Sequence, residues 1–157
     1  MTLSDSKRKK YAAKSQAAVE NRRTFARTFI EANREIIESD TVWVGAMEGH
    51  YDCYIFSGTL SLSGVVDDSG TAIAMSFDGT PSGGSIGLAE LTGVMTFSVT
   101  PQQGAGHCTF TGTIDAAEEG GAVVDFYQGN TNIGTFIGEA EGISAGAFSG
   151  SGTWKIN

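Results

Sequence analysis

The sequence predicts a mainly β protein: a small closed antiparallel β-barrel of about eight strands over residues 41–157, preceded by an N-terminal amphipathic α-helix in residues 1–40. Two observations support this division. All 22 glycines and both prolines lie after Asp40, whereas nine of the ten basic residues lie before it. After Asp40 the chain also breaks into short runs that alternate apolar and polar residues, separated by turn residues, as sandwiches and barrels do.

The first forty residues are predicted to form a basic helix with one apolar stripe. Strong helix formers fill the positions between apolar or small residues that recur at helical spacing, namely Tyr11, Ala18, Phe25, Phe29, Ala32 and Ile36. Such a stripe can pack on the barrel or close one of its ends, associate with a second protomer, or lie on a membrane surface. We expect Phe25, Phe29 and Ile36 to mediate whichever interaction the helix makes.

The strands are predicted from the period-two pattern and from turn chemistry. Some of the ten runs are expected to merge or fail, which leaves about eight strands, a common number for a small closed barrel. The runs are 42–48, 51–57, 59–66, 71–78, 85–91, 93–99, 107–114, 121–128, 133–140 and 145–156. Hairpin turns are predicted at 67–70 and 118–121, and a flexible glycine-rich loop at 79–87.

Clean alternation in several runs predicts one buried face and one wet face for each strand. Leu60 and Leu62, for example, alternate with Ser61 and Ser63. Closure removes exposed strand edges, which favours a barrel over an open sheet. A β-sandwich is the structural alternative.

Charge excludes some classes of partner. Residues 41–157 carry Lys155 as their only base against twelve acids, a net of −11, whereas residues 1–40 carry nine bases and six acids, a net of +3. The barrel should therefore repel nucleic acid and anionic membranes, so that an anionic partner would have to meet the first forty residues.

The chain contains no apolar stretch near eighteen residues, and its start has no apolar region of a secretory signal. We expect a protein secreted by a signal-independent route, a mature fragment, or a cytosolic protein.

The two cysteines, Cys53 and Cys108, have two interpretations. They could form one disulfide in an oxidising compartment, or they could be two buried thiols that behave as small apolar residues. Together with His50 and His107 they also suggest a zinc set, but neighbouring residues on a strand point to opposite faces, so neither pair converges. The same divergence argues against Cys108 as a nucleophile with His107 as its base. No cofactor and no catalytic residue is predicted.

The last third of the chain resembles a known family. The stretch 123–138 combines an aromatic-ending strand, a polar turn and an Ile-Gly-x-Phe strand, and a glycine-rich finish follows with Gly146, Gly150, Gly152 and Trp154. These features are similar to the end of the actinobacterial virulence-associated (Vap) proteins. The resemblance implies an eight-stranded barrel of two Greek-key halves, no known catalytic residues, and a role in host interaction during intracellular survival.

The chain departs from that family in its basic N-terminal helix, where the family has a disordered polar arm, and in its two cysteines. The leading hypothesis is a non-enzymatic barrel that acts through its surface, as a virulence-associated host-interaction factor. The alternative is a lipocalin- or avidin-like barrel that binds a small apolar ligand. A pocket lined by Leu60, Met75, Phe97 and Phe110 would favour the ligand binder, whereas a solid core would favour the surface-acting protein.

Overall fold

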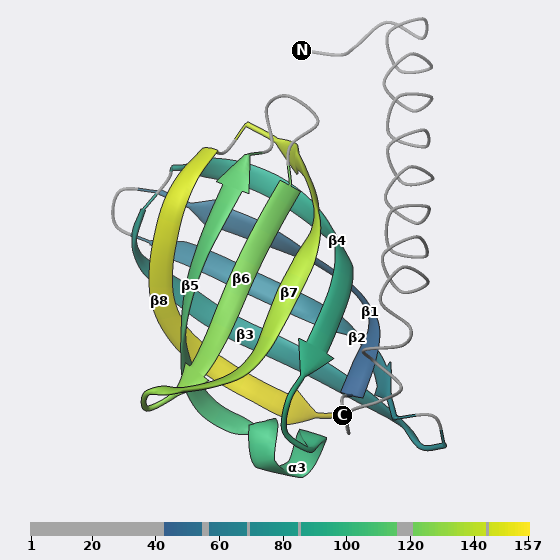
Figure 1. Cartoon of the computed structure of the whole chain (residues 1–157). Coiled ribbons are helices and arrows are strands. Elements are labelled where there is room, and N and C mark those ends of the chain that lie inside the picture. Colours follow the sequence, from purple (N-terminus) through teal and green to yellow (C-terminus); the bar gives the residue numbers. More distant parts are fainter. Residues whose placement is uncertain (1–42, 55–56, 69, 85, 116–120, 144) are drawn as a thin grey trace, which may run out of the picture.

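The computed structural model describes residues 43–54, 57–68, 70–84, 86–115, 121–143 and 145–157. These residues form eight strands and one short helix (Figure 1). The elements are β1 (Trp43–Cys53), β2 (Gly58–Asp67), β3 (Ala72–Gly84), β4 (Gly87–Phe97), α3 (Pro101–Gly104), β5 (Gly106–Asp115), β6 (Gly121–Gln128), β7 (Thr131–Gly142) and β8 (Ala145–Ile156). The predicted helix in residues 1–40 lies outside the described residues.

The eight strands close into one antiparallel barrel in the order β1-β2-β3-β8-β5-β6-β7-β4. Strands β1 to β3 are consecutive neighbours, and β4 returns to lie beside β1. Strands β5 to β7 repeat this arrangement, with β8 beside β5. Each half is therefore a Greek key, and the predicted closed barrel of two such halves is confirmed.

The strand predictions hold with three differences. Runs 42–48 and 51–57 merge into one strand, β1, which ends at Cys53, and runs 85–91 and 93–99 merge into one strand, β4, which ends at Phe97. Gly49 and Gly93, near these breaks, pair within long ladders, so a glycine there does not end the strand. The prediction of a flexible loop at 79–87 was wrong for most of its length, because β3 continues to Gly84 and pairs with β8 across a bulge.

Sequence reasoning missed the helix α3, which links β4 to β5 and lies at one end of the barrel (Figure 1). Thr100 caps it: its hydroxyl accepts from the Gln103 N–H at 3.2 Å, and the Gln103 side chain accepts from the Thr100 N–H at 3.3 Å. Pro101 occupies the first turn. This reciprocal cap with proline after it is a readable sequence signal, Thr-Pro-x-Gln.

The barrel interior is a single apolar cluster to which all eight strands contribute. Its centre is aromatic. The ring of Trp154 lies 5.2 Å from that of Phe77, 4.9 Å from that of Phe97 and 5.2 Å from that of Phe126, measured between centroids. The last two pairs are edge-to-face, the geometry that aromatic quadrupoles favour. The inward residues of the alternating runs thus meet as predicted.

Interior glycines make room for these rings. A Cβ on Gly152 would lie 2.4 Å from the carbonyl oxygen of Asp78 and 2.6 Å from the Phe77 ring. Gly79, which pairs with Gly152 across β3 and β8, is as crowded by the same ring. Backbone and aromatic ring therefore occupy the volume that any larger side chain would need.

We predict that Gly152→Ala destabilises the protein by about 1–3 kcal/mol, because the added methyl group overpacks the aromatic cluster. Gly70→Ala is the matched control, since a Cβ there meets nothing within 4 Å, and it should change stability by less than about 0.5 kcal/mol. Urea unfolding followed by tryptophan fluorescence measures both values. Equal stability of the two variants would contradict the packing described here.

Candidate functional site

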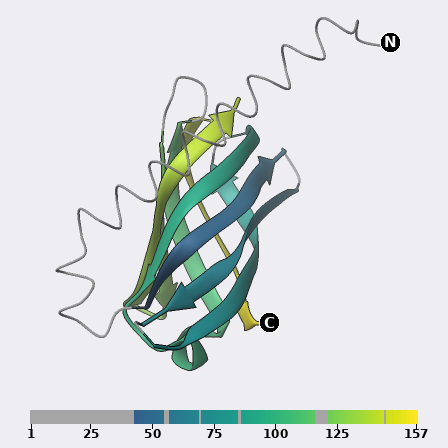
Figure 2. The ribbon, with the colours of Figure 1, turned by 90° about the vertical axis from the view of Figure 1, so that its right-hand side faces the viewer.

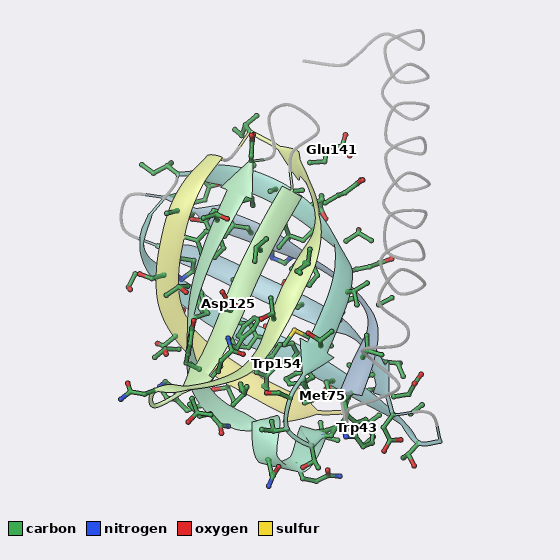
Figure 3. The ribbon with its side chains drawn as sticks, viewed as in Figure 1. Trp43, Met75, Asp125, Glu141 and Trp154 are labelled. Atoms are coloured by element: carbon green, nitrogen blue, oxygen red, sulfur yellow. The ribbon has the colours of Figure 1, made fainter. Side chains whose placement is uncertain are left out.

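The interior of the barrel is filled by its own side chains. The four residues predicted to line a pocket in a ligand-binding barrel, Leu60, Met75, Phe97 and Phe110, are each at most 1% exposed and belong to the same cluster. Figure 3 shows the side chains, with Met75 and Trp154 labelled. The rings of Phe77 and Phe110 meet edge-to-face at 5.7 Å. The interior is thus a packed core.

One buried polar atom of this core lacks a hydrogen-bond partner among the described residues. The indole nitrogen of Trp154 has no hydrogen-bond partner within the part of the chain that the structure describes. The rings of Phe97 and Phe126 meet the indole edge-to-face. Because no described side chain hydrogen-bonds to the indole nitrogen, this position lacks the convergent polar groups of a ligand site.

The two cysteines come from opposite ends of the barrel. Cys53 ends β1 and pairs with Gly58 and Gly87, at the end away from α3. Cys108 lies near the start of β5, directly after α3. Both are free and buried. The fold therefore does not bring the two thiols together, and burial raises the pKa of Cys108 to about 11.

The two histidines face outward and lie apart from the thiols. His50 Nδ1 lies 2.9 Å from the hydroxyl of Ser61 on the neighbouring strand β2, and His107 is exposed on β5. The alternation along each strand thus separates His107 from the buried Cys108, as the sequence indicated. Within the described residues no group of three or more histidine, cysteine or acidic side chains is placed to hold a metal ion.

A carboxylate on the outer face of β6 joins two neighbouring strands through hydrogen bonds. Asp125 (labelled in Figure 3) accepts a hydrogen bond of 2.6 Å from the Thr135 hydroxyl and one of 3.4 Å from the Asn132 amide, both on β7. These bonds cross a β6–β7 register shift at Phe126 and Tyr127. Because both of its donors are neutral, the cluster holds two strands together and offers no acid–base pair.

An exposed apolar patch lies at the barrel end opposite α3. We call it the rim patch and define it as Tyr54, Ile86, Leu88 and Ile143, which are 54%, 59%, 44% and 74% exposed. Their strands are neighbours: Cys53 pairs with Gly87, and the Ile143 N–H donates to the Leu88 carbonyl at 2.9 Å. The ends of β1 and β7 and the start of β4 thus bring four large apolar side chains to one rim.

Ile86, Leu88 and Ile143 are not predicted from the sequence as members of a surface patch. The sequence contains the pattern Ile-Gly-Leu around Gly87. This pattern indicates a surface patch only when β4 is known to lie between β1 and β7. The predicted interaction residues, Phe25, Phe29 and Ile36, lie outside the described residues. Among the described residues, no helix has the length and apolarity needed to cross a bilayer.

We predict that Cys108 resists iodoacetamide at pH 8 in the folded chain, because a thiol whose pKa is about 11 is almost wholly protonated there. Peptide mass spectrometry should find Cys108 unmodified in the native protein and fully modified in guanidinium chloride. As the pH rises from 9 towards 11, the unfolded state loses its proton first, so folding should become less favourable over this window. Rapid native labelling at pH 8 would contradict the burial.

Of three comparisons with known proteins, only the comparison with solved structures found matches. No protein-family model matches the chain, and no curated protein matches it. Among solved structures, the virulence-associated protein VapD from the intracellular pathogen Rhodococcus equi matches with a TM-score of 0.58 and 18% identity, over 73% of this chain and 99% of VapD. VapB from the same organism matches with a TM-score of 0.54 and 17% identity, over 73% of this chain and 97% of VapB. The chain is therefore structurally similar to the virulence-associated proteins VapD and VapB of Rhodococcus equi, as the resemblance of its last third predicted.

Proposed function

We propose that this protein is a non-enzymatic barrel that acts through its outer surface, as a host-interaction factor of the virulence-associated type. The observation that carries the proposal is the combination of a filled interior with an exposed rim patch. A barrel whose lumen is packed with its own side chains can recognise a partner only from outside. The structural similarity to VapD and VapB supports this role by analogy of fold.

The rim patch has the character of a contact surface. Soluble proteins seldom expose several large apolar side chains side by side unless these bind something. Carboxylates border the patch: Asp52 pairs with Leu88 across β1 and β4, and Glu90 pairs with Glu141 across β4 and β7. Apolar anchors with a charged rim are the usual anatomy of a protein interface. The partner should therefore offer an apolar surface flanked by basic groups.

The proposal requires that the protein leave the cell that makes it. We therefore propose secretion by a signal-independent route. The acidic barrel, with a net charge of −11 over residues 41–157, suits a protein that must stay soluble at a distance from its source. Detection of the full chain in culture medium without cell lysis tests this step.

We predict that Leu88→Lys with Ile143→Lys weakens binding of the full chain to cultured phagocytic cells by about tenfold, because two apolar anchors are lost. Thr109→Lys with Thr111→Lys is the matched control. It adds the same charge at exposed positions of β5 and should bind as the unaltered chain does. Flow cytometry of fluorescently labelled protein measures the binding. Equal loss in both variants, or no binding by the unaltered chain, would contradict the proposal.

The alternative function, a barrel that binds a small apolar ligand inside, has a separate test. We predict that benzene produces no saturable change in the NMR spectrum of the full chain, because the interior is packed. Phe110→Ala should create an apolar cavity that takes up benzene, since such cavities stay dry and bind it. Saturable binding of benzene to the unaltered protein would favour the ligand-binding barrel.

A further inference from the structure

Two buried valines do not belong to the barrel interior. Every buried apolar side chain in the described residues is part of the interior cluster except Val44, 9% exposed, and Val94, 1% exposed. On β1 the inward positions are those of Trp43 and Met47, so Val44 points outward; on β4 Val94 likewise lies between the inward Gly93 and Met95. Both valines are therefore buried on the outside of the barrel.

Other outward valines show how unusual this burial is. Val65 on β2 is 50% exposed and Val123 on β6 is 39% exposed. In the sheet, Val94 is flanked by Ala46 of β1 and Ile137 of β7. Side chains stand roughly perpendicular to a sheet, so these neighbours screen the sides of Val94 but not its tip. Burial to 1% requires a cover from outside the sheet.

The covered valines belong to a longer apolar row. Ala46 pairs with Val94, Val94 with Ile137, and Ile137 with Val123, so the row crosses β1, β4, β7 and β6. We call its covered members, Val94 and the partly buried Ile137, together with Val44, the outer strip; Ala46 and Val123, at the two ends of the row, are exposed. Figure 2 shows the side of the barrel on which β1 and β4 run next to each other. The strip is distinct from the rim patch, which lies at the far end of the same strands.

We propose that the N-terminal segment, residues 1–40, covers the outer strip of its own barrel through Phe25, Phe29 and Ile36. The place where the chain enters the barrel supports this occupant. The segment joins β1 at Trp43, beside Val44, at the first position of the strip. A covering element tethered there is present at a high effective concentration, which a free partner lacks.

Charge also favours this occupant. Beyond the strip, towards the rim, the outward face of β1, β4 and β7 carries Glu48, Glu90, Glu139 and Glu141, which the ladders place in two adjacent rows. Residues 1–40 carry a net charge of +3, with Arg22, Arg23 and Arg27 next to the phenylalanines. The basic segment and the acidic rows carry opposite charges and therefore attract each other. Lys155 is the only basic residue of residues 41–157 that could compete for these carboxylates.

The dimensions match. A helix from Ile36 back to Arg22 rises about 1.5 Å per residue and spans about 21 Å. On β1, the outward positions from Val44 to His50 span about 20 Å at about 3.3 Å per residue. A helix that starts over Val44 is therefore long enough to run from the strip to the acidic rows. Of the three uses predicted from the sequence, this inference selects packing on the barrel.

The test uses Val94→Cys in the full chain, a substitution that keeps the site small. With the phenylalanines in place, the thiol introduced at position 94 should react with a maleimide at least about tenfold more slowly than the one introduced by Thr111→Cys, on the exposed outer face of β5. Phe25→Asp with Phe29→Asp should raise the rate at position 94 to that at position 111. Protection of Cys53 and Cys108 in every variant shows that the barrel stays folded.

Three results would overturn the proposal. The first is rapid labelling at position 94 with the phenylalanines in place. The second is protection that survives the aspartate substitutions. The third is protection that disappears on dilution while light scattering shows a dimer becoming a monomer, which would assign the cover to a second copy of the chain. None of these depends on cell binding, so the proposed function can fail independently.

Discussion

The edge-to-face aromatic cluster around Trp154 is the interaction on which the rest of this fold depends. Phe77, Phe97 and Phe126 approach the indole from β3, β4 and β6, so one group of rings joins strands of both Greek-key halves. The rings fit because the paired residues Gly152 on β8 and Gly79 on β3 have no side chain. A core of this kind leaves no lumen to be used for binding. The proposed function accordingly uses the outside of the barrel and its ends.

The two ends differ because the connections differ. The link from β4 to β5 is long enough to form α3, whose reciprocal Thr100–Gln103 cap and buried Pro101 give it a fixed shape at that end. At the opposite end, where β7 finishes and β4 starts, large apolar side chains are exposed: Leu88 is 44% exposed and Ile143 is 74% exposed. One end of the barrel thus carries a short capped helix, and the other exposes a group of apolar side chains. This asymmetry gives the rim patch its place in the proposed function.

The sequence predicted the barrel because period-two alternation survives closure: Leu60, Leu62 and Cys108 point inward as their patterns indicated. It predicted the strand ends less well. Gly49 and Gly93 look like strand ends in the sequence, but both pair within continuous ladders. The rim patch and the outer strip could not be predicted, because both depend on β4 lying between β1 and β7, a non-local pairing. Separation of the two cysteines to opposite ends depends on the same topology.

The uneven distribution of charge connects these features. Nine of the ten basic residues precede Asp40, whereas twelve of the eighteen acidic residues follow it, so the two parts of the chain attract each other wherever the tether allows contact. The tether enters beside Val44, and the acidic rows on β1, β4 and β7 begin within two residues of the strip. A basic segment held there would neutralise the face next to the rim while the remaining barrel surface stays acidic. Some of the carboxylates that border the rim patch would then already be paired with basic residues of the N-terminal segment. A partner at the rim would therefore be selected mainly by its apolar surface and less by its charge.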